Sequence, residues 1–296
     1  MTMGDLVRRA AERLPALAGA VARPVGDGWT CDTFELTATD GSLWIAQSPR
    51  SPYAADRLRA QGSLLPELAH EISSAIPEPA APLGEPPLLV YRRIDGRPCD
   101  EVPGGIWPER FGRFLYDLHA VPPELVGLRA ITAVQARDRT RATCAVLADA
   151  VLPRLDADER EAAEAMLAAL LDDDEMWAFA PVLTHGDLGP EHVLVTPGGD
   201  LAGVIDWEEA ALDDPAGDLA WWLHAMPAVG EHALAAYGGA PDRRFRERAR
   251  IRFALMPWHE VVHGLDAGGP AFVDSGLAGV RERLVRPTGP GSPSPP

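Results

Sequence analysis

The most informative part of this 296-residue sequence is residues 182–219, which read VLTHGDLGPEHVLVTPGGDLAGVIDWEEAALDDPAGDL. Two short apolar runs, residues 193–196 and 201–205, flank the sequence Pro197-Gly198-Gly199. Apolar runs on either side of such a turn predict a β-hairpin. Because antiparallel strands lie only about 4.8 Å apart, side chains at the two ends of the hairpin can act together. The polar side chains around it are His185, Asp187, His192, Asp206, Asp213, Asp214 and Asp218.

These groups match the needs of phosphoryl transfer. One carboxylate must orient an attacking hydroxyl and accept its proton, and further ligands must hold the metal ion that bridges the nucleotide phosphates. A metal-dependent hydrolase site made of His185, Asp187 and His192 is an alternative, but it leaves the hairpin with Asp206 unexplained. A purely structural role, in which Asp187 caps a turn, is a second alternative.

The same motifs resemble those of the aminoglycoside phosphotransferase-like antibiotic kinases, which are distant relatives of protein kinases. The match comprises His185-Gly186-Asp187 with His192, then Ile205-Asp206-Trp207, then Asp214-Pro215-Ala216-Gly217-Asp218-Leu219. A histidine in place of the family's usual asparagine, here His192, is similar to the macrolide 2'-phosphotransferases. The run HGDLG is similar to the viomycin and capreomycin phosphotransferases. The resemblance covers roughly residues 20–270.

This resemblance implies an α+β, two-lobed, protein-kinase-like fold. Residues 1–94 would form the nucleotide-binding lobe, with a small antiparallel sheet and a hinge at its end. Residues 95–286 would form a mainly helical lobe for catalysis and acceptor binding. Residues 287–296 contain only Pro, Gly, Ser and Thr and are predicted to be disordered, because they cannot bury apolar surface.

Local patterns along the chain agree with this division. Period-two alternation predicts strands, and apolar residues at helical spacing predict helices. The predicted strands are residues 25–36, 43–47, 88–93, 193–196 and 201–205. The predicted helices are residues 4–21, 53–69, 107–120, 132–150, 158–171, 214–226 and 243–265.

The resemblance also implies roles for single residues. Asp187 matches the catalytic aspartate, Asp206 the Mg²⁺ ligand and His192 the second metal position. An imidazole is a poorer Mg²⁺ ligand than an amide oxygen, so His192 can instead bind a metal-bound water. His185 and Asp218 match structural positions that shape and hold the catalytic loop. The expected nucleotide contacts are Gly26 and Gly28 in a glycine loop, Gln47, Arg50, and the hinge residues 90–94 with Tyr91 and Ile94.

Two positions depart from the family pattern. The strand cation that holds the nucleotide phosphates falls on Gln47, and its helix glutamate partner falls on Gln61. Replacing the cation and its anion partner together is electrostatically consistent, because replacing only one of them would leave the other as an unpaired charge in a partly buried site. We expect the two amides to hydrogen-bond each other and Arg50 to be the nearest cation for the phosphates, with a surface role for Arg50 as the alternative.

The acceptor site is less well marked. Glu208, next to Asp206, and His259 and Glu260, on a late helix of the kind that walls the acceptor pocket in this family, are the candidate contacts. A solvated polar face is the alternative explanation for all three.

The net charge of −17 indicates which classes of binding partner suit this chain. All 27 of its basic residues are arginine. Such an acidic chain is a poor partner for nucleic acid and anionic membranes, whereas it would attract a cationic small molecule; solubility alone is the alternative reason. Three widely spaced cysteines, no leader and no long apolar stretch favour the cytoplasm. The oligomeric state is left open.

Together these features predict an O-phosphotransferase. With Mg²⁺, it would move the γ-phosphate of ATP or GTP to a hydroxyl of an antibiotic, giving resistance or self-protection. The alternatives are a metabolic kinase acting on choline, homoserine or a thiosugar, and a catalytically silent, nucleotide-binding pseudokinase. Gln47 and Gln61 favour the pseudokinase, whereas Asp187 and Asp206 favour the active enzyme.

Overall fold

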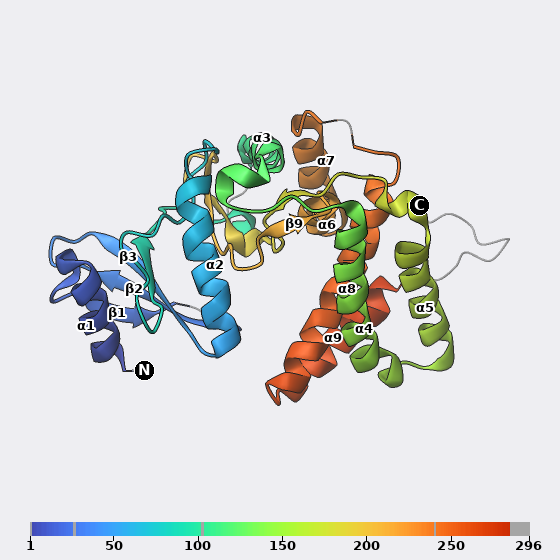
Figure 1. The fold of residues 1–296 in the computed structure, drawn as a ribbon, viewed down its shortest axis with the longest axis horizontal. Coiled ribbons are helices and arrows are strands. Elements are labelled where there is room, and N and C mark those ends of the chain that lie inside the picture. Colours follow the sequence, from blue (N-terminus) through green and yellow to red (C-terminus); the bar gives the residue numbers. More distant parts are fainter. Residues whose placement is uncertain (1, 26–27, 102–103, 240, 285–296) are drawn as a thin grey trace. The chain divides into compact units, whose positions relative to one another are not determined.

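The computed structural model describes residues 2–25, 28–101, 104–239 and 241–284 of the chain (Figure 1). It contains antiparallel sheets and many helices, which agrees with the predicted α+β class. The chain divides into two compact units. The first unit comprises Met1–Arg129, Leu183–Ala211 and His232–Gly238, and the second comprises Ala130–Val182, Leu212–Glu231 and Gly239–Pro296.

The first unit is built on a four-stranded antiparallel sheet in the order β1-β2-β3-β4. Its strands are β1 (Val21–Pro24), β2 (Cys31–Thr37), β3 (Leu43–Pro49) and β4 (Leu89–Arg92). Helix α1 (Met3–Arg13) packs on one face through Leu6 and Ala10. Helix α2 (Pro52–Leu68) packs on the other face through Leu58.

The alternation of β3 decides which side chains meet each helix. Ala46 belongs to the core under α1, whereas Ile45 belongs to the core under α2. Successive side chains of a strand point to opposite faces, so Gln47 shares the α2 face with Ile45. In the ladder, Gln47 stands between Thr33 of β2 and Leu89 of β4.

The β-hairpin predicted over residues 193–205, which carries the candidate catalytic residues at its ends, also lies in the first unit. Strands β7 (Val193–Val195) and β8 (Leu201–Val204) pair antiparallel, as predicted, and β5 (Arg97–Pro98) adds a third strand next to β7. Helix α3 (Trp107–Ala120) matches its predicted range. Strands β6 (Val182–Thr184) and β9 (Ala211–Asp213) form a separate pair at the two ends of the segment that contains this hairpin. The 3-10 turns of this unit are Pro15–Leu17, Cys99–Glu101, Pro123–Val126 and Pro190–His192.

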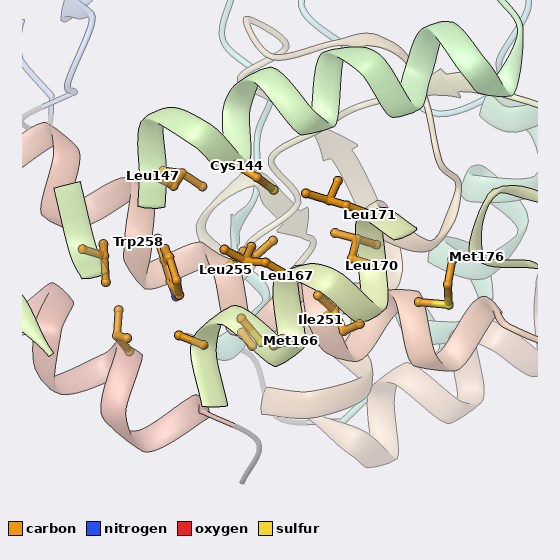
Figure 2. Close-up of a cluster of buried hydrophobic side chains, with 14 of the residues drawn as sticks. Cys144, Leu147, Met166, Leu167, Leu170, Leu171, Met176, Ile251, Leu255 and Trp258 are labelled. Carbon is orange, nitrogen blue, oxygen red and sulfur yellow. The ribbon is translucent and has the colours of Figure 1, made fainter. Parts of the chain in front are cut away.

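The second unit is helical. Its core is drawn in Figure 2, where Cys144 and Leu147 of α4 face Leu167 and Leu170 of α5. Helix α8 completes this core with Ile251, Leu255 and Trp258. The helices of this part of the chain are α4 (Ala133–Val151), α5 (Ala157–Asp172), α6 (Ala216–Ala225), α8 (Phe245–Asp266) and α9 (Pro270–Arg283), with 3-10 turns at Leu152–Arg154 and Asp174–Trp177. Helix α7 (Pro227–Ala236) belongs to the second unit up to Glu231 and to the first unit from His232 on.

Several boundaries differ from the sequence predictions. The first helix was expected to reach residue 21 but ends at Arg13, because Pro15 lacks the N–H that would continue it. Of the expected strand over 25–36, only residues 31–36 lie in a strand, β2, and the strand before it, β1, ends at Pro24. Helices α7 and α9 were not predicted. Gly26 and the tail 287–296 lie outside the described residues.

The compact units are not the lobes predicted from the sequence. Residues 95–129 and the β-hairpin over residues 193–205 pack with the first unit, because β5 joins β7 and α3 lies against β8. The predicted lobe boundary at residue 94 stays a prediction. Within the described ranges, no helix combines the length and apolar character that crossing a membrane requires.

A buried ion network holds the second unit together. The guanidinium of Arg248 is fully buried and donates to Asp214 at 2.9 Å and to Asp242 at 2.7 Å. It also lies 4.6 Å from the ring centre of Phe179. Arg252 reaches the same Asp214 carboxylate at 3.1 Å. Two arginine guanidinium groups therefore contact the buried Asp214 carboxylate and compensate its charge.

Replacing Arg248 by alanine is expected to lower the free energy of unfolding by about 3 kcal/mol. This is the lower end for a broken buried pair, because Arg252 still reaches Asp214. Urea unfolding followed by circular dichroism measures it. The matched control is Arg246→Ala, which removes an exposed pair with Glu231 and is expected to cost no more than about 1 kcal/mol. Equal losses in the two variants would contradict the role of the network.

Candidate active site

The structure brings Asp187, His192 and Asp206 together in the first unit. The Nδ1 atom of His192 lies 2.7 Å from the backbone oxygen of Asp187 and donates to it. Its Nε2 atom lies 3.5 Å from a carboxylate oxygen of Asp206, and the Asp187 carboxylate lies 3.8 Å from Nδ1. His192 thus stands between the two aspartates that the sequence motifs single out.

Two unusual backbone positions set this arrangement. Gly186 has φ +85°, and a Cβ there would come within 2.5 Å of the backbone oxygen of Glu209. Only glycine fits this position, so the loop carrying Asp187 can lie directly against the segment after Asp206. Asp206 itself has φ 68°, a left-handed conformation that costs energy in a non-glycine residue. Such strain is typical of functional positions, where surrounding contacts maintain it.

His185 connects the loop to the hairpin. Its side chain is fully buried, and Nε2 lies 3.0 Å from the backbone oxygen of Ile205, to which it donates. Its Nδ1 atom accepts from the backbone N–H of Asp187 at 3.3 Å. The ring also packs against Trp207, with 4.6 Å between ring centres. These contacts make His185 a support for the residues on both sides of the site.

The electrostatics of the site are dominated by crowded carboxylates. Burial, with added repulsion from neighbouring acids, raises the pKa of Asp187 to about 6, although 60% of its side chain is open to solvent. Burial and the carboxylates of Glu208 and Glu209 likewise raise the pKa of Asp206 to about 6. At pH 7 both aspartates are therefore mainly ionised, and the cluster attracts cations.

The pKa of His192 moves in the same direction for another reason. Burial works against its charged form, but the pull of the Asp206 and Asp187 carboxylates outweighs burial and raises the pKa of the imidazole. His192 therefore attracts both carboxylates, and they in turn favour its charged form.

The site suits a magnesium ion that arrives with a nucleotide. Among the described residues, no group of three or more His, Cys, Asp or Glu side chains could hold a metal ion alone. Mg²⁺ typically takes one or two protein carboxylates and completes its shell with water and substrate phosphates. Asp206, with His192 beside it, fits that pattern.

Replacing His192 by asparagine is expected to leave the enzyme active, because an amide oxygen is a better Mg²⁺ ligand than an imidazole nitrogen. Turnover at saturating Mg²⁺ and the Mg²⁺ concentration for half-maximal rate are the measurements. A folded His192→Asn enzyme without turnover would show that the imidazole has a role of its own.

The residues predicted to contact the nucleotide phosphates, Gln47 and Arg50, make only part of the contacts expected of them. Gln47 and Gln61 are both buried on the α2 face, but their amides do not hydrogen-bond each other: Gln47 Oε1 and Gln61 Nε2 are buried without a partner among the described residues. The expected amide pair is therefore wrong. Arg50 donates to the backbone oxygen of Gly28 and, at 2.7 Å, to Asp32. The Arg50 guanidinium thus links the backbone at Gly28 to Asp32 of strand β2.

Part of the predicted hinge, residues 90–94, is hydrogen-bonded into the sheet. The backbone oxygen of Val90 accepts from Ala80, and the N–H of Arg93 donates to Leu43. Tyr91 pairs with Ile45, and its side chain is buried. Residues 90–93 therefore continue strand β4, and Ile94 is the first residue of the predicted hinge beyond this pairing.

The acceptor candidates lie in different units. Glu208, in the first unit, accepts the hydroxyl of Thr30 at 2.5 and 2.8 Å, and burial raises its pKa. His259 and Glu260 lie on α8 of the second unit, where Glu260 accepts from Ser275. Asp218 is buried in α6 of the second unit. The roles predicted for these four residues stay predictions.

Sequence reasoning missed one ion pair at the site. Arg57 of α2 contacts Glu209, three residues after Asp206, and 27% of its side chain is exposed. Neither residue was among the site residues predicted from the sequence. The only available signal was spacing: Arg57 precedes Gln61 by one helical turn and so lies on the same face of α2.

Comparison with known proteins agrees with this geometry. The model of the phosphotransferase enzyme family matches residues 21–254. Viomycin phosphotransferase of Streptomyces vinaceus is 30% identical over 261 residues, which cover 81% of this chain and 88% of that protein.

Solved structures share the fold. The GDP complex of aminoglycoside 2'-phosphotransferase-IIIa superposes with a TM-score of 0.81 and 20% identity, covering 96% of this chain and 99% of that one. Macrolide 2'-phosphotransferase MphH from Brachybacterium faecium gives a TM-score of 0.74 and 27% identity, covering 94% of this chain and 98% of that one. These similarities confirm the protein-kinase-like α+β fold and the predicted enzyme class: the chain is a phosphotransferase and belongs to the phosphotransferase enzyme family.

Proposed function

We propose that this enzyme transfers the γ-phosphate of a nucleoside triphosphate to a hydroxyl group of an antibiotic. The observation that carries the proposal is the cluster of Asp187, His192 and Asp206, in a chain that is 30% identical to viomycin phosphotransferase. The resulting activity would give resistance or self-protection.

The exposed Asp187 carboxylate has the properties of a general base. With a pKa of about 6, it is ionised at neutral pH and still basic enough to accept a proton from a polarised hydroxyl. Its loop is fixed by Gly186 and His185, so the carboxylate is positioned before the acceptor arrives. Asp187 would orient the acceptor hydroxyl and receive its proton as the bond from the acceptor oxygen to the γ-phosphorus forms and the bond from that phosphorus to the departing nucleoside diphosphate breaks.

Asp206 and His192 are the residues that would hold Mg²⁺ with the nucleotide. When bound, the ion neutralises charge on the phosphate oxygens and aligns them for transfer. The donor would be ATP or GTP, with Gly28 near its phosphates and Ile94 and the following residues near its purine. Gly26 is expected beside Gly28.

The acceptor would be an antibiotic, for which Glu208 in the first unit and His259 and Glu260 in the second unit are separate candidate contacts. The net charge of −17 and the carboxylates around Asp206 favour a cationic acceptor. The proposal needs no nucleic-acid or membrane partner.

The test is a transfer assay with purified enzyme, Mg²⁺, and ATP or GTP labelled at the γ-phosphate. The acceptor panel contains viomycin, aminoglycosides and macrolides, and also choline, homoserine and a thiosugar. Label is expected on an antibiotic, and cells expressing the chain should be less susceptible to that compound. Labelling of a metabolite alone would support the metabolic kinase, whereas nucleotide binding with no transfer to any acceptor would support the pseudokinase.

A further inference from the structure

Among the residues that the structure describes, those predicted to contact the nucleotide phosphates include no free cation. A nucleoside triphosphate must approach a cluster that already contains the carboxylates of Asp187, Asp206, Glu208 and Glu209. Protein kinases supply a strand lysine paired with a helix glutamate at this point. Here the strand position is the neutral Gln47, and Arg50 is held by Asp32 and the oxygen of Gly28.

Arg57 is placed to supply the missing charge. Its guanidinium contacts the carboxylate of Glu209, which directly follows Glu208 in the chain. The same two glutamates act electrostatically on Asp206. Gly186 brings the backbone of Glu209 against the loop of Asp187. Arg57 is therefore linked, through Glu209, to both aspartates of the site.

Polar atoms around Arg57 are left without partners. Arg57 Nε and Gln61 Nε2 are buried donors with no hydrogen-bond acceptor among the described residues, and the Gln61 side chain is 3% exposed. The two residues are one turn apart on the same face of α2, which also faces Gln47 of β3. Buried donors without acceptors are costly, so their presence at a ligand site indicates that a ligand supplies the acceptors. Phosphate oxygens are acceptors of this kind.

We propose that Arg57 is the residue that contacts the nucleotide phosphates, in place of the strand lysine, and that Glu209 holds its guanidinium until the nucleotide binds. The inference rests on the nucleotide-dependent transfer proposed above. Arginine suits the role because its planar group offers several donors and remains charged beside carboxylates. Gln61 donates to the same phosphates from one turn further along α2.

The competing explanation is that the ion pair of Arg57 and Glu209 is a structural strut, which only holds α2 against the turn after Asp206. The two explanations differ in what Glu209 does. A strut weakens equally when either partner is removed. A phosphate contact is lost with Arg57, whereas neutralising Glu209 frees the guanidinium for the nucleotide.

The experiment measures the affinity of the purified full chain for ATP and GTP with Mg²⁺, and for adenosine and guanosine, by calorimetry. Arg57→Ala is expected to weaken triphosphate binding by about 10- to 100-fold, as for the loss of a charge-assisted contact, with nucleoside binding unchanged. Arg57→Lys should restore part of the affinity, and Glu209→Gln should bind triphosphate at least as tightly as the parent. The matched control is Arg59→Ala, which removes a more exposed arginine of α2 that pairs with Asp56 and Glu85.

The outcomes separate the inference from the proposed function. A parent enzyme that binds no triphosphate would contradict the function and the inference together. If the parent binds but Arg57→Ala binds equally well, only the inference fails. Equal losses in Arg57→Ala and Glu209→Gln, or a matching loss of nucleoside binding, would identify a strut instead. Thermal unfolding of each variant confirms that the folded chain is being measured.

Discussion

Replacing Asp187 by alanine is expected to reduce turnover by a factor of about 10² to 10⁴ while nucleotide affinity is retained. The carboxylate is the group of the site that is most open to an acceptor, with 60% of its side chain exposed. The base that accepts the proton is lost in the variant, but Asp206 and His192 remain to hold Mg²⁺ with the nucleotide. Turnover under saturating substrates and a separate nucleotide titration are the two measurements.

The backbone around Asp187 makes this variant informative. The loop is held by Gly186, by the fully buried His185 and by the bond from His192 to the Asp187 backbone oxygen, none of which needs the Asp187 side chain. The matched control is Asp56→Ala, an exposed aspartate of α2 that pairs with Arg59, with no expected loss of turnover. Near-normal turnover in Asp187→Ala would remove Asp187 from the mechanism.

The β-hairpin over residues 193–205 could be predicted because its determinants are local. Strands β7 and β8 need only apolar runs of the right length and the turn at Pro197-Gly198-Gly199 between them. Once the hairpin exists, its geometry places Asp206 near the loop of Asp187 and His192. The spacing of these residues in the sequence was therefore enough to predict the cluster.

The pairing on the phosphate side could not be predicted in the same way. The family resemblance placed Gln47 opposite Gln61, and Gln47 does lie on the face of the sheet that α2 covers. Periodicity says nothing of how far two side chains reach, and the amides of Gln47 and Gln61 do not meet. The contact between Arg57 and Glu209 joins residues far apart in the chain, so it depends on tertiary packing that no local pattern encodes.

Helix α9 is a second feature that the sequence patterns did not predict. Its sequence is rich in small residues and carries a weak apolar stripe, so helical spacing did not reveal it. The structure explains the small residues: a Cβ on Gly276 would come within 2.7 Å of a Val261 methyl group. Glycine at this point lets α9 approach α8 closely, although it lowers helix propensity. Packing rather than local preference therefore forms α9.

The variant Asp206→Asn is expected to lose the Mg²⁺-dependent part of nucleotide binding. Asp206 is the carboxylate through which the cluster would hold the ion, and an amide oxygen carries no charge to offset that of the metal. His192 alone cannot compensate, because imidazole is a poor ligand for Mg²⁺. Nucleotide affinity is measured by calorimetry at a series of Mg²⁺ concentrations and again in excess chelator.

Asparagine is the right replacement because of the backbone at this position. Asp206 has φ 68°, and asparagine tolerates the left-handed region, whereas alanine would add about 1–2 kcal/mol of strain. With Asp206→Asn, a lost response to Mg²⁺ is therefore not a consequence of a distorted turn. Parent and variant should bind nucleotide alike in chelator and diverge as Mg²⁺ is added. A variant whose affinity rises with Mg²⁺ as steeply as that of the parent would show that the ion is held elsewhere, and Asp206 would then be a structural residue at a strained turn.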